Sequence, residues 1–182
     1  KFGDKPVYAC ANLPYYITTP AIAALLDSHA FQGVTVMVQK EVARRICAPA
    51  GSSDYSAFSI YVQYHADARI LFDVPAGCFV PQPKVDSAVL RLTPRETPAV
   101  QVQDEKLFFA IVRAAFNQRR KTLANAVSPA FGGRLNKDEI LELITGCGLD
   151  ARVRGEKLSL AEYGRLADAA AARLAAKATS PE

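Results

Sequence analysis

Short apolar runs alternate with helical stripes along the first fifty residues. Val7–Ala11 and Val34–Val38 are apolar, as expected for interior strands of a parallel sheet. Between them, apolar positions at helical spacing predict a helix that ends near Ser28, with Thr19 as its N-cap and Pro20 at its first helical position. This order predicts a parallel sheet covered by helices.

Four more segments complete the first half of the chain. Glu41–Cys47 and Tyr55–His65 have the spacing of helices, whereas Arg69–Val74 and Val85–Leu92 have the composition of strands. The proline-rich loop between these two strands is short enough to join an antiparallel pair at the sheet edge. The first half therefore predicts an α/β fold.

The pattern changes after Thr93–Pro98, which we take as a linker because it has two prolines and little apolar content. Beyond it, every periodic segment has helical spacing, with Asp104 and Asn136 as candidate N-caps. The predicted helices are Lys106–Asn117, Arg119–Val127, Lys137–Cys147 and Leu160–Ala176. We therefore expect an α/β domain over residues 1–97 and a small all-α domain over residues 98–182.

Composition narrows the class of protein. Half of the 182 residues are hydrophobic, which is enough for a packed core and excludes a wholly disordered chain. No apolar run approaches the ~20 residues that a membrane helix needs. The four cysteines stand far apart without a C-x-x-C pair, as in a cytosolic protein with reduced thiols, so we expect no metal site. Because the chain starts at Lys1 and reaches a strand almost at once, we expect it to be a fragment.

Positive charge is concentrated in one stretch of the second half, although the formal net charge of the chain is only +4. The cations Arg113, Arg119, Arg120 and Lys121 lie close together with no acidic residue among them. Such a cluster is typical of a surface that binds a polyanion. The alternative is a solvated helix face, with Arg119 in a structural ion pair between domains.

One turn carries the strongest candidate chemistry. Asn12-Leu13-Pro14-Tyr15 follows the first strand directly, at the carboxyl end where open α/β sheets bind ligands. It is similar to the N-[LPI]-P-[YF] motif of S-adenosylmethionine-dependent methyltransferases that act on amino groups of nucleobases. The alternative is a plain turn, in which Asn12 is a turn residue and Tyr15 belongs to the core.

Two later motifs resemble one family within that class, the ribosomal RNA adenine dimethyltransferases. Phe79–Ala88 is similar to its F-x-P-x-P-x-V-x-S signature, and Arg113–Leu123 to its R-x-x-F-x-x-R-R-K-T-L stretch. The motifs occur in the family's order and span nearly all of the chain. The chain resembles the bacterial enzymes of the small (16S) subunit in particular.

This resemblance implies a Rossmann-like methyltransferase domain, of which residues 1–97 are the C-terminal, target-base half. It implies a helical RNA-recognition domain over residues 98–182. The implied reaction is methyl transfer from S-adenosylmethionine to the N6 amines of two adjacent adenosines in 16S ribosomal RNA. The implied partner is the 30S subunit or its precursor, and the implied protein is a cytoplasmic monomer without membrane contact.

The resemblance also implies roles for single residues. The side-chain oxygen of Asn12 and the backbone carbonyl of Leu13 accept the hydrogens of the adenine amine, on a turn stiffened by Pro14. Tyr15 and Phe79 hold the extruded base between them, because base–aromatic stacking is worth roughly 1–3 kcal/mol per base. Asn12 also borders the cofactor. The residues implied to bind RNA phosphates are Arg113, Arg119, Arg120, Lys121 and Lys84.

The chain departs from the family in one large respect. The glycine-rich E-x-G-x-G-x-x-[TS] loop is absent, as is the acidic residue that binds the cofactor ribose. We therefore expect this polypeptide alone to be inactive and to bind S-adenosylmethionine weakly or not at all. The alternative hypothesis is a non-catalytic RNA- or ribosome-binding module that retains the methyltransferase fold.

Overall fold

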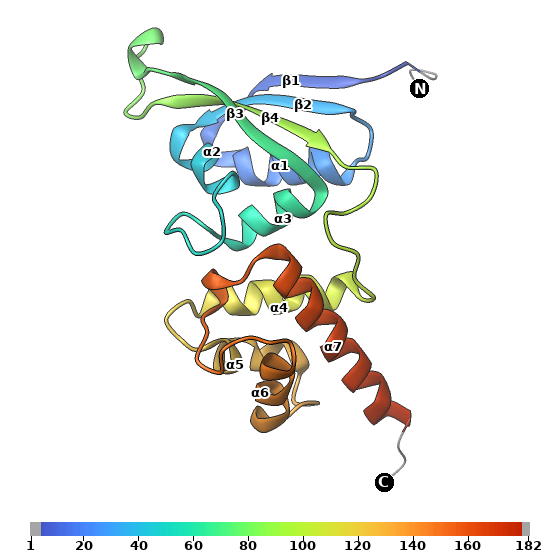
Figure 1. Ribbon diagram of the computed structural model, residues 1–182. Helices are drawn as coiled ribbons and strands as arrows, with labels where there is room; N and C mark the ends of the chain where they lie inside the picture. The colour runs from blue at the N-terminus through green and yellow to red at the C-terminus, as the bar shows by residue number, and fades with distance from the viewer. Residues whose placement is uncertain (1–4, 180–182) are drawn as a thin grey trace. The chain divides into compact units, whose positions relative to one another are not determined.

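The computed structural model describes residues 5–179, so Lys1 lies outside the described residues. The chain divides into two compact units, each with its own core (Figure 1). The sheet unit contains the residues up to Ala48 together with Phe58–Ala99. The helical unit contains the chain from Val100 onward and also takes the loop Pro49–Ala57 from the first half of the sequence.

The sheet unit is built on one mixed four-stranded sheet. Its elements are β1 (Tyr8–Asn12), the 3-10 helix η1 (Tyr15–Ile17), α1 (Thr18–Asp27), β2 (Gly33–Gln39), α2 (Lys40–Ile46), α3 (Ala57–His65), β3 (Ala66–Val74), the 3-10 helix η2 (Ala76–Cys78) and β4 (Ser87–Pro94). The strand order is β1-β2-β4-β3. β1 and β2 are parallel, and β4 is antiparallel to both of its neighbours. The expected parallel pair and the expected antiparallel pair at the edge are both confirmed.

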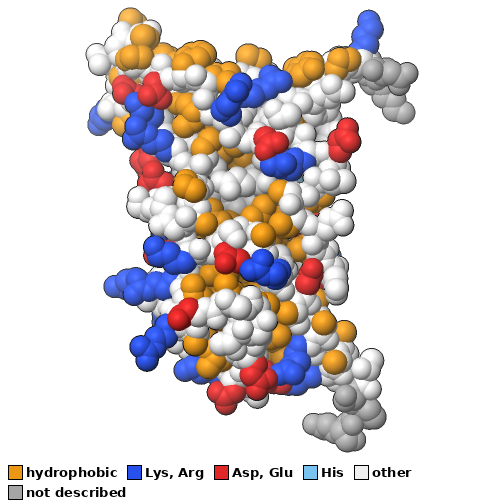
Figure 2. All heavy atoms as spheres, viewed as in Figure 1, with side chains coloured by type: hydrophobic (Ala, Val, Ile, Leu, Met, Phe, Trp, Pro, Cys, Tyr) orange, Lys and Arg blue, Asp and Glu red, His pale blue; other side chains and the backbone are white. Residues whose placement is uncertain are grey.

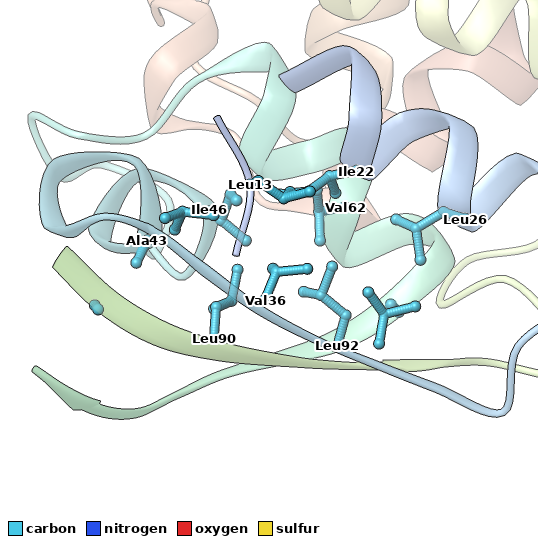
Figure 3. Packing of buried hydrophobic residues seen from close by; sticks show 13 residues of the cluster. Leu13, Ile22, Leu26, Val36, Ala43, Ile46, Val62, Leu90 and Leu92 are labelled. Carbon is cyan, nitrogen blue, oxygen red and sulfur yellow. The ribbon is translucent and has the colours of Figure 1, made fainter. Parts of the chain in front are cut away.

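The core of this unit lies between the sheet and its helices. Val34, Val36 and Val38 are fully buried, whereas Thr35, Met37 and Gln39 are half-buried, so one face of the strand points into the core. These side chains meet Ile22 and Leu26 from α1 and further residues from α2, α3 and β4 (Figure 3). The sheet is thereby held firmly enough to position the turns that leave its strands.

Two helix starts differ from the sequence prediction. Thr19 is not an N-cap, because α1 begins at Thr18 directly after η1 and the Thr18 hydroxyl donates to the Pro14 carbonyl. The helix expected from Tyr55 begins at Ala57 instead. Tyr55 lies outside this helix because its ring is buried against Phe116 in the helical unit, with ring centres 5.7 Å apart.

The helical unit consists of helices and turns, as the sequence predicts. Its elements are α4 (Glu105–Asn117), α5 (Leu123–Val127), the 3-10 helix η3 (Ser128–Phe131), α6 (Lys137–Gly146), the 3-10 helix η4 (Gly155–Lys157) and α7 (Leu160–Thr179). Asp104 caps α4 by accepting from the backbone N–H of Leu107, and Asn136 caps α6 in a reciprocal pair with Glu139. Both expected caps are confirmed.

The prediction of a helix over Arg119–Val127 is wrong at the start of that helix. α5 begins only at Leu123, and Gln118 to Thr122 form a turn in which the Lys121 N–H donates to the Gln118 carbonyl. Thr122 has an extended backbone. The side chain of Arg119 reaches partners elsewhere in the helical unit, and that contact favours the turn over another helical turn.

One pair of glycines in the helical unit has a structural role only. Gly146 and Gly148 have the G-x-G spacing of a nucleotide-binding loop, but they lie at the carboxyl end of α6 and not after a strand. Gly148 has a positive φ of 76°, as expected for a residue that ends a helix. Over residues 5–179, no helix has the length and apolar character to cross a membrane.

Candidate active site and RNA-binding surface

The turn after β1 exposes one polar side chain on a fixed backbone. Asn12 is the last residue of β1 and its side chain is exposed. Leu13 continues the sheet by donating its N–H to the Met37 carbonyl at 3.2 Å, and its side chain is only 9% exposed. The Pro14 carbonyl accepts from the Ile17 N–H and starts η1. The amide of Asn12 therefore stands free at the carboxyl end of a firmly held strand.

All five residues expected at the catalytic centre line one pocket. The pocket has a volume of about 300 Å³ and lies within the sheet unit. Its lining residues are Asn12, Leu13, Pro14, Tyr15, Phe79, Pro81 and Pro83. The turn after β1 supplies one side of the pocket and the loop between β3 and β4 supplies the other, although these segments lie more than sixty residues apart.

The chemistry of this lining suits a neutral aromatic ligand. Two partly buried aromatic rings and three prolines supply flat apolar surface. The amide of Asn12 and the backbone groups of the turn are the polar components, and none of the seven lining residues is charged. A nucleobase fits that combination, since its faces are stacked on aromatic rings and its edge is read by hydrogen bonds.

Within residues 5–179, Tyr15 is the one lining residue whose side chain forms a hydrogen bond. Its hydroxyl lies 2.8 Å from the hydroxyl of Ser87, which is fully buried at the start of β4. Tyr15 is therefore neither a loose surface ring nor a fully buried core residue. Ser87 lies inside the quoted Phe79–Ala88 motif, but its contact with Tyr15 crosses 72 residues and leaves no signal in the sequence.

The loop that carries Phe79 is closed at its base by Asp86. The Asp86 carboxylate accepts from the backbone N–H of Ala76 at 3.0 Å, and its backbone carbonyl accepts from the N–H of Lys40 at 3.0 Å. The side chain of Lys40 pairs with Asp73 at 2.6 Å. Asp86 is a second residue that the sequence reasoning missed, because its two partners, Ala76 and Lys40, come from two different segments.

The lining of the pocket suits a single base better than a whole nucleoside cofactor. A nucleoside cofactor is normally held by a carboxylate on its ribose and by backbone N–H groups of a glycine loop, and the lining has neither. Among the described residues, no cluster of three or more His, Cys, Asp or Glu side chains is arranged to hold a metal ion.

Arg119 has a structural role that distinguishes it from the neighbouring cations. Its Nε donates to the Glu156 carboxylate at 3.0 Å, and a terminal nitrogen donates to the Ser53 carbonyl at 3.2 Å. Its guanidinium also lies over the Phe116 ring. All of these partners belong to the helical unit, so the ion pair that we considered between domains lies within one unit.

The other predicted RNA-binding side chains are exposed. Arg113 on α4 and Arg120 and Lys121 in the following turn take part in none of the ion pairs found within residues 5–179. Residues 116–121 line a hollow of about 400 Å³. Figure 2 shows Lys and Arg side chains projecting beside the turn after α4. Lys84 is exposed on the proline-rich loop of the sheet unit.

Burial raises the pKa of two tyrosines in the helical unit. Burial, with a smaller contribution from the charge of Glu162, raises the pKa of Tyr55 to about 12. Burial also raises the pKa of Tyr163, whose hydroxyl donates to the Gly155 carbonyl at 2.9 Å. Both phenols therefore stay protonated near neutral pH and help to hold the loop Pro49–Ala57 and η4 in place.

The chain matches one family model over most of its length. That model is described as ribosomal RNA adenine dimethylase, and it matches residues 3–170. A protein named Ribosomal RNA small subunit methyltransferase A from Lachnoclostridium phytofermentans is 50% identical over 169 residues, covering 92% of this chain and 58% of the relative. The protein of the same name from Geobacillus kaustophilus is 48% identical, covering 88% of this chain and 56% of the relative.

Solved structures share the fold. A dimethyladenosine transferase from Plasmodium falciparum superposes with a TM-score of 0.76 at 26% identity, covering 91% of this chain and 67% of that chain. The 23S rRNA methyltransferase ErmE superposes with a TM-score of 0.67 at 18% identity, covering 91% and 66%, and so shows the fold alone. The chain thus has a methyltransferase-like α/β fold and spans less than three fifths of the length of the curated relatives described above.

Proposed function

This chain belongs to the ribosomal RNA adenine dimethylase family, and from that premise we propose that the complete gene product methylates the N6 amines of two adjacent adenosines in 16S ribosomal RNA during 30S assembly. The methyl donor in this proposal is S-adenosylmethionine, and the protein acts in the cytoplasm as a monomer. One observation carries the proposal: Asn12, Leu13, Pro14, Tyr15 and Phe79 line a single uncharged pocket at the carboxyl end of β1.

The two halves of the chain then have separate tasks. Residues 1–97 are the C-terminal, target-base half of a Rossmann-like catalytic domain, and residues 98–182 form a helical RNA-recognition domain. The strand order β1-β2-β4-β3 supports the first assignment, because its parallel side lets further parallel strands add beside β1. The relatives' greater length supports it as well.

The adenine amine is a weak nucleophile because its lone pair is delocalised into the ring. The side-chain oxygen of Asn12 and the carbonyl of Leu13 accept its two hydrogens, which favours a tetrahedral nitrogen and frees the lone pair. The cofactor supplies an electrophilic methyl group on a sulfonium. Tyr15 and Phe79 fix the plane of the base, so that most of the rate comes from orientation, and no dedicated general base is needed.

Exposed cations supply the electrostatic part of RNA binding. Arg113, Arg120 and Lys121 contact phosphates from the helical unit, and Lys84 does so beside the base pocket. Each such contact releases a counterion, so binding weakens as salt rises. Arg119 supports this surface indirectly, since its own charge is already engaged by Glu156.

Primer-extension mapping of adenine dimethylation on ribosomal RNA tests the proposal. Cells that lack the intact gene are compared with the same cells complemented by the complete gene product. We expect two adjacent dimethyladenosine stops in 16S RNA that vanish in the deletion strain and return on complementation. Unchanged methylation in the deletion strain, together with binding of the protein to 30S particles in the complemented strain, would instead support a non-catalytic ribosome-binding module.

A further inference from the structure

We propose that Ser87 is a positioning residue that holds the ring of Tyr15 in the base pocket, and that Asp86 beside it fixes the loop that carries Phe79. The inference rests on the proposed function, in which these two rings hold the target adenine. It adds a reason why the rings keep their places, which is that the Tyr15 ring and the loop carrying Phe79 are each hydrogen-bonded to one of two adjacent residues.

Ser87 is rigidly placed. It is the first residue of β4 and pairs with Gln39 on one side and Val74 on the other, so its backbone is held by two neighbouring strands. Its side chain is completely buried, and the Tyr15 hydroxyl lies 2.8 Å away. A buried hydroxyl left without a partner costs about 1–3 kcal/mol, so the pair favours one position of the Tyr15 ring.

Asp86 holds the opposite wall. Its carboxylate accepts from the Ala76 N–H, and its backbone carbonyl accepts from the Lys40 N–H. The bond to Ala76 closes the loop between β3 and β4 at its base, and the bond from Lys40 joins Asp86 to the start of α2. Phe79 lies one residue beyond η2 in that loop. The side of the pocket with Tyr15 and the side with Phe79 are thus held by Ser87, the first residue of β4, and by Asp86, the residue before it.

A fixed separation matters because the reaction depends on orientation. Misplacement of a reacting group by about 1 Å can cost ~10²-fold in rate. The Asn12 amide sits on a separately anchored strand end. If a ring tilts, the adenine amine moves away from its acceptors while the rest of the RNA stays bound. Loss of the Ser87 contact should therefore lower kcat and leave the KM for S-adenosylmethionine unchanged.

Paired variants of the complete gene product test this inference, with undermethylated 30S subunits as substrate. Ser87→Ala and Tyr15→Phe remove the same hydrogen bond from its two ends, and Tyr15→Phe keeps the ring. We expect each variant to lower kcat about tenfold, and the double variant to be no slower than the slower single variant. Losses that multiply in the double variant, or an unchanged kcat in both single variants, would refute the positioning role.

Ser59→Ala is the matched control. Ser59 is also fully buried in the sheet unit, and its hydroxyl donates to the Arg45 carbonyl, away from the pocket. We expect it to lower thermal stability while kcat stays at the wild-type value. If Ser59→Ala loses as much kcat as Ser87→Ala at equal stability, the effect of Ser87 is general destabilisation and the proposal fails.

A structural readout separates this proposal from the proposed function. NMR spectra of the ligand-free protein should show the Tyr15 ring signals displaced by Ser87→Ala and the Phe79 ring signals displaced by Asp86→Ala, with neither displaced by Ser59→Ala. Wild-type ring signals in Ser87→Ala would overturn the positioning role. A wild-type protein that fails to methylate adenosine would contradict the proposed function, and the ring signals would still decide the role of Ser87.

Discussion

Asn12 and Leu13 are adjacent in the turn after β1, yet the first side chain is exposed and the second is buried. The contrast follows from the strand: Leu13 faces the core and its N–H completes the sheet, while Asn12 ends β1 on the side that faces the pocket. Fixing a backbone in advance removes conformational entropy that a ligand would otherwise have to overcome. At the residue scale, the polar group is free to bind because its neighbour is anchored.

Replacing Asn12 with Ala in the complete gene product should reduce methyl transfer at least 100-fold. The variant loses the side-chain acceptor for the adenine amine but keeps the turn, because the backbone contacts of Leu13 and Pro14 do not involve the Asn12 side chain. Methyl incorporation into undermethylated 30S subunits measures the loss, and a filter-binding assay checks that RNA affinity stays within a few-fold. Retained turnover would refute the role of Asn12.

Arg119 and Arg120 are neighbours with opposite expected phenotypes. Arg119→Ala removes a partner of Glu156 and of the Ser53 carbonyl, so it should lower the melting temperature with little change in the salt dependence of RNA binding. Arg120→Ala should leave stability unchanged and reduce the slope of log affinity against log salt by about 1. Calorimetric melting and binding at several salt concentrations measure the two effects. The reverse pattern would show that Arg119 is the phosphate ligand.

At the scale of elements, local signals predicted most of the fold and long-range contacts account for the errors. The apolar run of β2 and the cap at Asn136 act over a few residues, and both were predictable. The late start of α5 was not, because Arg119 is engaged by Glu156, 37 residues away. The pocket residues were recognisable from their motifs, whereas Ser87 was not, since its partner lies 72 residues earlier.

The loop Pro49–Ala57 contains Tyr55, which makes the helical unit less stable at alkaline pH. The pKa of Tyr55 is about 12 in the folded chain and ~10 when unfolded, so its contribution to stability is complete below pH 10. As the pH rises from 10 towards 12, only the unfolded state ionises and stability falls by on the order of 2 kcal/mol. Tyr55→Phe should therefore resist alkaline unfolding better than wild type in urea titrations at pH 7 and 11. Tyr16→Phe, at an exposed tyrosine, is the control and should show no difference.

At the scale of the whole molecule, we propose that this chain is the part of a methyltransferase that receives the base. Its pocket supplies aromatic surface and an amide, with no charged group in the lining. The chain aligns with 58% of the Lachnoclostridium relative, so a large part of that relative has no counterpart in these residues. In the proposed function, RNA is recognised by residues of this chain and most of the cofactor by residues outside it, so the two can be measured separately.

Isothermal titration calorimetry can measure cofactor binding apart from RNA binding. The 182-residue chain should give no saturable heat with S-adenosylmethionine, because the pocket lining has no carboxylate for a ribose and the sequence has no E-x-G-x-G-x-x-[TS] loop. The complete gene product should bind the cofactor, and the two proteins should bind a 16S RNA fragment with similar salt slopes, since Arg113, Arg120 and Lys121 are present in both. Circular dichroism checks that the shorter chain is folded. Tight cofactor binding by the 182 residues alone would mean that these residues hold it without a glycine loop.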